Sequence, residues 1–392
     1  MKSEREIGIV VYGATGYTGK LVAEYLYKQY GDNGGVSWAL AGRSLAKLES
    51  VRAELGISAT IPLVICDADE PASITAMVRR AAVVITTVGP YQLYGSELVA
   101  ACAAAGTDYV DLCGEPTWMK QMIDAHAAAA AKSGARIVFS CGFDSIPFDL
   151  GVMYLQDRAQ QAFGRVLPRV RGRVRGMKGV WSGGTLASFK VTMAAAAKDP
   201  TLGALLMNPF ALTPGFTGPG QPTGMKPEYD EVLGSWVAPF VMATVNTKNI
   251  HRSNLLLNHR YGVDFVYDEM FLTGPGDEGE AMARAIAGDK SMATDPTRPG
   301  DGPTREQRET GFYDLLFVGA TGQGETLRAS VKGDMDPGYG STSKMIAETA
   351  VCLLRNPQAA AGGIWTPAAA LGELLIDRLQ RNAGLTFALE QG

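Results

Sequence analysis

Three glycines spaced three residues apart are the first feature of this sequence that could do chemistry. Gly13, Gly16 and Gly19 lie in VVYGATGYTGKLVAEYL, after a β-rich run and before a helical one. Gly13 would allow a tight exit from the strand, Gly16 a close approach of phosphate to the backbone, and Gly19 close packing of the helix. A GxxGxxG turn in this context is a variant of the dinucleotide fingerprint, in which pyrophosphate meets the positive end of a helix. We therefore predict cofactor contacts from Gly13, Thr15, Gly16, Tyr17, Thr18 and Gly19.

The residues after the next two predicted strands indicate which dinucleotide is bound. NAD-binding domains carry an acidic residue at the end of the second strand, whereas Arg43 and Ser44 stand there in ALAGRS. A guanidinium suits a ribose 2′-phosphate, so we predict NADP(H). The alternative is a solvated arginine in a loop. Asp67, after the third strand, is either an acceptor for the adenine amino group or an acid that starts a helix.

Candidate catalytic residues follow the fourth and sixth predicted strands. In TTVGPY, Gly89 and Pro90 would let the backbone face the nicotinamide, and Tyr91 would either donate to a carbonyl or stack on the nicotinamide ring. In FDSIP, Asp144 and Ser145 would orient substrate or relay a proton, or would only shape a crossover between domains. Both interpretations stay open for each site.

The elements that must position these residues alternate along the first third of the chain. β-branched runs alternate with helical stretches, which predicts a doubly wound parallel sheet of the Rossmann type. The expected strands are 7–12, 36–41, 61–65, 82–88, 108–112 and 135–140.

The pattern changes after about Leu150, where we expect a second, α+β domain with a mixed or antiparallel sheet. Residues 169–175 alternate arginine with other residues, residues 312–333 suggest a hairpin, and Ser341 is a candidate N-cap for a closing helix. The predicted division is a nucleotide domain (1–145), a substrate domain (146–335) and a C-terminal helical segment (336–392).

Composition excludes several classes of protein. The chain has 392 residues and a net charge of −4, which offers no general attraction to nucleic acid. The five cysteines are never spaced CxxC, so we expect no disulfide framework, no zinc or other metal site, and a cytoplasmic location. No stretch reaches the roughly 18 apolar residues of a membrane span, although peripheral membrane contact stays open. The three histidines are isolated, and the sequence does not reveal an oligomeric state.

Two further patterns bear on the substrate. Arg169, Arg171, Arg173 and Arg175 would share one face of a strand, which is either solvated or a docking site for an acidic carrier protein or a coenzyme phosphate. The apolar stretches Leu202–Phe216 and Val232–Val245 suit a lipophilic chain better than a small zwitterion, although ordinary core would look the same.

Several motifs in one order resemble the saccharopine dehydrogenase-like family of NADP-binding oxidoreductases. They are GATGYTG, AGRS, TTVGPY, DYVDLCGE, CGFDSIPFDLG, SGGTLAS and GYGSTSKM. They are most similar to the branch that contains the trans-acting enoyl reductases of mycobacterial lipid biosynthesis. The resemblance implies a Rossmann domain, a substrate domain with a mixed sheet, a C-terminal segment packed near the nucleotide domain, and NADPH-dependent reduction of an activated C=C bond in a lipid- or polyketide-type thioester. Two alternatives stay open: reduction of an amino-acid-derived imine, and an NADP-binding module without turnover.

Overall fold

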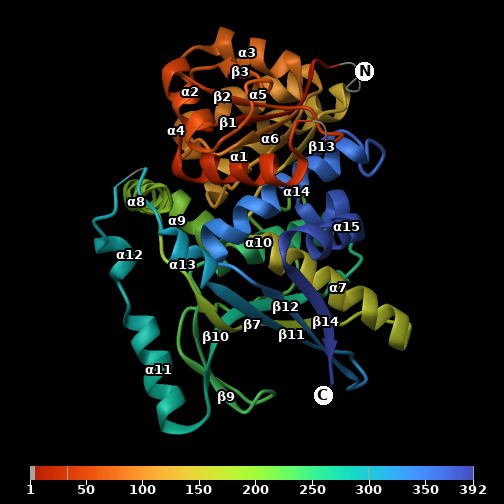
Figure 1. The fold of residues 1–392 in the computed structure, drawn as a ribbon. Coiled ribbons are helices and arrows are strands. Elements are labelled where there is room, and N and C mark those ends of the chain that lie inside the picture. Colours follow the sequence, from red (N-terminus) through yellow and green to blue (C-terminus); the bar gives the residue numbers. More distant parts are fainter. Residues whose placement is uncertain (1–4, 33, 299, 392) are drawn as a thin grey trace.

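The computed structural model describes residues 5–32, 34–298 and 300–391. Two sheets form an upper and a lower layer, with helices between them and around the upper sheet (Figure 1). Within the described residues no helix is both long and apolar enough to cross a bilayer.

The upper sheet is the predicted Rossmann-type sheet, and every strand pair in it is parallel. In the described part of the chain it has seven strands. From one edge to the other they are β13 (Gly363–Trp365), β6 (Arg136–Val138), β5 (Asp108–Val110), β4 (Ala81–Thr86), β1 (Ile7–Tyr12), β2 (Trp38–Gly42) and β3 (Leu63–Ile65). From β1 the strand order runs outward through β2 and β3 on one side, and through β4, β5 and β6 on the other.

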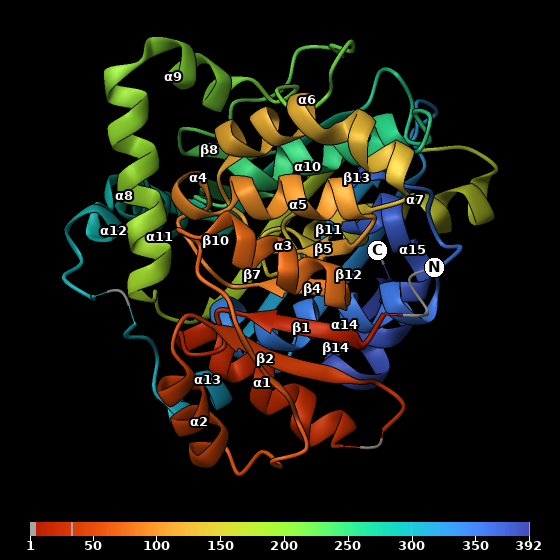
Figure 2. The ribbon, with the colours of Figure 1, turned by 90° about the horizontal axis from the view of Figure 1, so that it is seen from above.

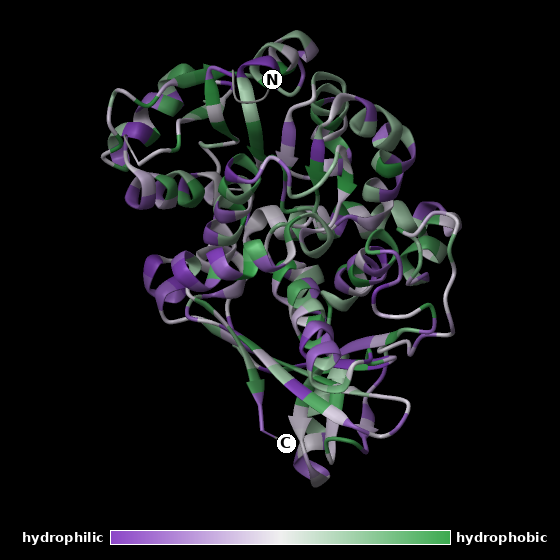
Figure 3. Ribbon diagram, turned by 90° about the vertical axis from the view of Figure 1, so that its right-hand side faces the viewer, coloured by the Kyte–Doolittle hydropathy of each residue, from purple (hydrophilic) through white to green (hydrophobic). Residues whose placement is uncertain are grey.

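Helices cover both faces of this sheet. Alternate residues of β1 serve two separate cores: Ile9 and Val11 belong to one, and Val10 and Tyr12 to the other. All six residues of β1 and of β4 are buried, as expected for a sheet covered on both sides, and Figure 3 shows hydrophobic residues in the strands of this layer. The helices are α1 (Tyr17–Tyr30), α2 (Leu45–Glu54), α3 (Pro71–Arg80), α4 (Tyr91–Tyr94), α5 (Ser96–Ala105), α6 (Pro116–Ser133) and α14 (Thr342–Arg355).

The lower sheet is mixed, as predicted. Strands β7 and β10 run parallel, and the other neighbours are antiparallel, including the expected hairpin of β11 and β12. Its order is β14 (Leu385–Glu390), β12 (Thr326–Gly333), β11 (Phe312–Ala320), β7 (Arg169–Lys178), β10 (Val266–Gly274), β9 (Ser235–Pro239) and β8 (Glu228–Asp230).

The remaining helices lie between the sheets or at the periphery. Helices α7 and α10 pack on the lower sheet, whereas α8 and α9 stand at one edge of the molecule (Figure 2). The bounds are α7 (Ile146–Phe163), α8 (Gly183–Lys198), α9 (Pro200–Met207), α10 (Ala243–Leu256), α11 (Gly276–Gly288), α12 (Ser291–Thr294), α13 (Arg305–Glu309) and α15 (Pro367–Arg378), with π-helical turns η2 (Pro337–Ser341) and η3 (Leu379–Ala383).

The C-terminal segment contributes a strand to each sheet, β13 to the upper and β14 to the lower. Helix α14 packs on α1, where Glu348 accepts hydrogen bonds from the hydroxyls of Tyr25 (2.7 Å) and Tyr30 (2.5 Å). Ser341 stands at the predicted N-cap position of α14, but its side chain makes no capping hydrogen bond. The carboxylate of Asp336 instead accepts the backbone N–H groups of the preceding turn. The boundaries between the three predicted segments remain predictions.

Candidate functional site

A cavity of about 630 Å³ lies at the carboxyl edge of the upper sheet. One wall consists of the turn after β1 and the residues that follow β2, β3 and β4. The other wall consists of α8, residues 241–245 and the turn η2. The site is therefore at the switch point of the parallel sheet, where ligands of doubly wound folds bind.

The three glycines of the first turn have different surroundings. Gly13 has a φ of +89°, and a Cβ atom there would lie 2.7 Å from Oγ1 of Thr87. A Cβ atom on Gly19 would lie 2.1 Å from the carbonyl oxygen of Gly13. A Cβ atom on Gly16 would meet nothing closer than that same oxygen, at 3.3 Å. Gly13 and Gly19 are thus required by the turn itself, whereas Gly16 leaves its cavity side open.

The start of α1 fits the pyrophosphate of a dinucleotide. Gly16 is the N-cap and offers no side chain to the first turn, which contains no acidic residue. Thr15, Gly16, Tyr17 and Thr18 line the cavity, whereas Gly19 does not. Uncapped N–H groups at the positive end of a helix suit an anionic group, so the structure fits the predicted cofactor.

The residues predicted to select the nucleotide separate into two groups. Arg43 is exposed and Asp67 is half-buried, and both line the cavity. Ser44 does not line it, because its hydroxyl caps α2 by accepting from the amide of Lys47 at 3.4 Å. Asp67 also accepts from the amide of Asp69 at 3.1 Å, so it stabilises the loop before α3.

Tyr91 lines the cavity, and its hydroxyl is engaged by backbone groups. The hydroxyl donates to the carbonyl of Thr86 at 3.3 Å and accepts from the amide of Leu112 at 3.0 Å. Burial raises the pKa of Tyr91 well above its ordinary value. The two hydrogen bonds engage the hydroxyl and count against its donating to a substrate carbonyl, and stacking of Tyr91 on the nicotinamide ring stays a prediction. Gly89 lines the cavity beside it, and Pro90 does not.

Asp144 and Ser145, adjacent in sequence, are placed differently. Asp144 lines the cavity, where a Cβ atom on Gly114 would lie 2.7 Å from its Oδ2. Burial raises the pKa of Asp144 to about 7, against a lowering effect from its own backbone amide. Ser145 is fully buried, and its hydroxyl accepts from Nδ2 of Asn249 at 2.8 Å. Direct contact of Ser145 with substrate is therefore excluded in this conformation.

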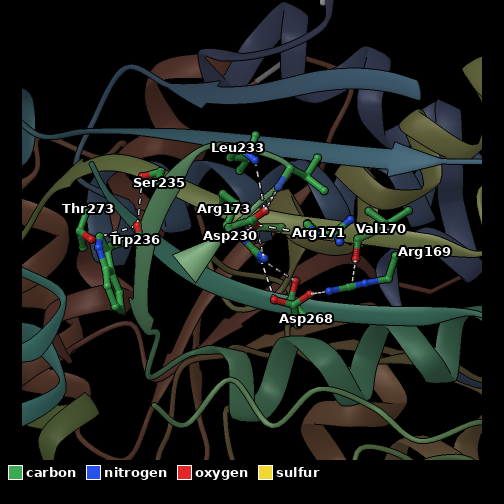
Figure 4. Close-up of polar contacts among 12 residues, drawn as sticks. Arg169, Val170, Arg171, Arg173, Asp230, Leu233, Ser235, Trp236, Asp268 and Thr273 are labelled. Atoms are coloured by element: carbon green, nitrogen blue, oxygen red, sulfur yellow. Dashed lines mark hydrogen bonds and ion pairs between the residues drawn. The ribbon is translucent and has the colours of Figure 1, made fainter. Parts of the chain in front are cut away.

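The arginines of β7 are neutralised by carboxylates of their own sheet (Figure 4). Arg173 has a side-chain exposure of 2% and binds Asp230 at 2.8 Å and Asp268 at 2.7 Å. Arg169 also pairs with Asp268, through the other carboxylate oxygen. The interpretation of this strand as a solvated face is wrong for Arg173, because its guanidinium lies in the interior.

The other two arginines of β7 are also accounted for. Arg175 binds Asp314 at 2.7 Å and Glu390 at 2.6 Å, and Arg171 lies 3.8 Å from Asp230. None of the four lines the cavity. Among the described residues that line the cavity, Arg43 is the only lysine or arginine.

The two apolar stretches each divide between core and cavity. In the first, Leu206 lines the cavity while Phe210 and Leu212 are buried. In the second, Val237 is buried in β9, and Val241, Met242 and Val245 line the cavity. The core interpretation is therefore confirmed for Phe210, Leu212 and Val237, whereas the fit of the cavity-lining residues to a lipophilic chain stays a prediction.

Sequence reasoning missed a polar cluster on the second wall. The hydroxyl of Tyr339 accepts from the amide of Ser182 at 2.5 Å and lies 2.8 Å from Oγ1 of Thr185. These residues come from SGGTLAS and GYGSTSKM, motifs that the sequence offered without a role. The cluster joins η2 to the start of α8 at the cavity.

A second missed contact ties the glycine turn to the rest of the chain. The hydroxyl of Tyr17 donates to the carbonyl of Pro303 and accepts from Nη1 of Arg308 at 2.8 Å. Its ring packs edge-on against Tyr339, with centroids 5.4 Å apart. A Cβ atom on Gly302 would meet this ring at 2.6 Å. Residues 300–304 therefore close over the start of α1.

Comparisons with known proteins identify the family of the chain. Residues 9–138 match the family described as the saccharopine dehydrogenase NADP-binding domain. A Mycobacterium tuberculosis protein whose name proposes trans-acting enoyl reductase activity is 41% identical, with 96% of each chain covered. The trans-acting enoyl reductase of Mycobacterium bovis is 38% identical over 96% of each chain, and that of Mycobacterium ulcerans is 37% identical over 98% of each.

A solved structure supports the fold. Saccharopine dehydrogenase (L-Glu forming) from Saccharomyces cerevisiae superposes with a TM-score of 0.53 at 13% identity, covering 98% of this chain and 100% of that one. The identities over nearly the full length, together with the NADP-binding domain and the shared fold, settle the family. The chain belongs to the trans-acting enoyl reductases, a branch of the saccharopine dehydrogenase-like NADP-dependent oxidoreductases.

Proposed function

We propose that this protein is an NADPH-dependent reductase of the activated C=C bond in a lipid- or polyketide-type thioester. The observation that carries the proposal is one cavity that unites the glycine turn with an opposite wall that includes apolar side chains of α8, α9 and residues 241–245. They are Phe189, Met193, Leu206, Val241, Met242 and Val245. The names of the relatives support the same reaction.

The cofactor would lie along the first wall of the cavity. Gly16, Tyr17 and Thr18 would hold the pyrophosphate, and Arg43 the 2′-phosphate, with Asp67 near the adenine. Bound NADPH supplies a hydride to the β-carbon of the enoyl group. The remaining chemistry falls to the side chains of this chain.

The reaction also needs a proton at the α-carbon, and we assign its supply to Asp144. A carboxyl group with a pKa of about 7 is partly protonated at neutral pH and therefore serves as a general acid. Asp144 is on the cavity wall, whereas the hydroxyl of Tyr91 is engaged by backbone groups. The half-buried Ser188, whose hydroxyl is 3.7 Å from a Cβ placed on Gly89, would donate to the thioester oxygen as it gains charge.

An amino-dicarboxylate imine is the second candidate, and the charges of the cavity count against it. Such a substrate needs cations that converge on its carboxylates, but the arginines of β7 are neutralised elsewhere. Arg43, the cation on the cavity wall among the described residues, is assigned to the cofactor. The ion pairs of the β7 arginines also remove the support for β7 as a docking site of an acidic carrier protein. The proposal that the thioester is linked to a carrier or to CoA therefore rests on the family alone.

The proposed location is cytoplasmic. All five cysteines are free and buried, which supports a protein that folds in a reducing compartment.

The test is oxidation of NADPH by the purified protein on long-chain enoyl thioesters and on lysine-derived imines, with saturated thioesters as blanks. We expect turnover of the enoyl thioesters. Turnover of the imines alone would overturn the proposal, and tight NADPH binding without turnover of either would support a binding module.

A further inference from the structure

One face of α8 follows the cavity along most of its length. The cavity-lining residues of this helix recur at helical spacing. They are Gly184, Thr185, Ser188, Phe189, Thr192 and Met193. Because a helix rises about 1.5 Å per residue, this stripe is about 13 Å long from Gly184 to Met193.

The stripe changes character along its length. Its first half is small and polar, with Thr185 bound to Tyr339 and Ser188 next to Gly89 at the cofactor edge. Its second half carries Phe189 and Met193, which share the cavity with Leu206, Val241 and Val245. Thr192 also lies in this half, and its hydroxyl accepts from Nε2 of Gln92 at 3.1 Å. A ligand with a polar reacting end and an alkyl tail matches this gradient in one orientation.

Leu206 is held in place at the apolar end. The Nζ atom of Lys248, which is 2% exposed, donates to the carbonyl of Leu206 at 2.7 Å and to that of Thr244 at 2.8 Å. None of the eight residues of α9 is fully buried, so this bond adds to the contacts that α9 makes with α6 and α8. The cavity beside it opens outward, because Met193 is 49% and Val241 is 42% exposed.

We propose that the α8 stripe is the track for the acyl chain and that Leu206 determines how strongly long chains are held. The thioester would lie beside Thr185 and Ser188, and the alkyl tail would run past Phe189 to Leu206, leaving the cavity between Met193 and Val241. This inference rests on the proposed function for the class of substrate. It adds the orientation in which the substrate lies in the cavity and the residue that selects the length of the acyl chain.

Substitution at adjacent residues of α9 separates the track from a general effect of bulk. Leu206→Trp would fill the apolar end, whereas Met207→Trp puts the same bulk on a residue that is 61% exposed and does not line the cavity. Met193→Trp is a second track variant at an exposed position that tolerates bulk. Melting temperature and NADP⁺ affinity verify that each variant is folded.

The readout is calorimetric binding of saturated acyl thioesters of N-acetylcysteamine, of increasing chain length, to the full protein with NADP⁺. Each methylene that the wild-type track buries should tighten binding by about fourfold until the track is full. In Leu206→Trp and Met193→Trp this gain should stop at a shorter chain, with a loss of tenfold or more for long chains and little change for a four-carbon one. Met207→Trp should behave as wild type.

An unchanged length profile in both track variants, or an equal loss in Met207→Trp, would overturn the inference. Because the probes cannot be reduced, the result does not depend on turnover. A profile that shifts as expected in a protein that reduces no enoyl thioester would support the track and refute the proposed function. If the protein reduces enoyl thioesters but the track variants leave the dependence of binding on chain length unchanged, the proposed function would be supported and the track refuted.

Discussion

Gly19 packs so closely on the exit from β1 that a Cβ atom there would lie 2.1 Å from the carbonyl oxygen of Gly13. The obstacle is backbone, which cannot move aside as a flexible side chain would. We therefore expect Gly19→Ala to destabilise the protein by about 1–3 kcal/mol through overpacking, measured by urea denaturation. A stability equal to wild type would contradict this geometry.

Gly16 provides the matched contrast within the same turn. Its Cβ position is 3.3 Å from the carbonyl oxygen of Gly13, a tight contact that a shift of a few tenths of an ångström relieves, and its φ of −79° suits any residue. Gly16→Val should therefore fold with a melting temperature near that of wild type but lose most of its NADPH affinity, measured by fluorescence titration. A folded variant with full affinity would show that Gly16 does not face the phosphates.

Arg43 should determine the preference for NADPH over NADH. Loss of a charge-assisted contact costs about 1.5–3 kcal/mol, or roughly ten- to hundredfold in affinity. Arg43→Asp should lose or reverse the preference, measured by paired titrations with the two cofactors. Equal affinities in the wild-type protein would refute the assignment.

Most of the residues predicted to bind the cofactor line the cavity, because the sequence signals for them are local. Glycine spacing and strand–helix alternation lie within a few residues of the contacts that they create. The strand β13 carried no such signal, because its three residues pair with Arg136–Val138, more than two hundred positions earlier. The partners of Arg173 were hidden for the same reason, since Asp230 and Asp268 come from different strands.

The catalytic side of the site was predicted less well, because position in the sequence does not determine side-chain direction. Tyr91 stands at the expected place after β4, yet its hydroxyl is directed at the backbone of Thr86 and Leu112. Asp144 and Ser145 are adjacent, but only Asp144 lines the cavity. The apolar stretches showed hydrophobicity without showing which residues face a ligand.

Asp144 should give the reaction a pH dependence near neutrality. With a pKa of about 7, its acid form is present below that pH, so kcat/KM should fall toward tenfold per pH unit above it. Asp144→Asn should lose about 100-fold or more in rate and lose this limb of the profile, while NADPH affinity is kept. A profile unchanged by the substitution would remove Asp144 as the acid.

The same shift has a consequence for stability with a definite sign. A raised carboxyl pKa means that the folded state binds the proton more tightly than the unfolded one, so the folded wild type loses stability as the pH rises from about 4 to 7. Asp144→Asn should therefore be more stable than wild type at pH 8, and the difference should shrink toward pH 4. Denaturation at the two pH values measures it, and a difference that grows toward pH 4 would contradict the assignment.

Arg308 should assist cofactor binding through Tyr17, without touching the cavity itself. Arg308→Ala removes the donors to Tyr17 and to the carbonyl of Pro303, both at 2.8 Å. We expect weaker NADPH binding and faster amide exchange in residues 300–308. Arg305→Ala is the control, because that exposed arginine pairs with Glu309 on the same helix. Equal effects of the two substitutions would refute the coupling.

The isotopic composition of the product tests the central claim most directly. Purified enzyme would be incubated with a long-chain enoyl thioester and NADPH deuterated at the transferable position, and in a second reaction with ordinary NADPH in D₂O. We predict a saturated thioester with one deuterium at the β-carbon in the first reaction and one at the α-carbon in the second. Recovery of unreduced enoyl thioester, alongside deuterium transfer from the same NADPH to the carbon of a lysine-derived imine, would contradict the account.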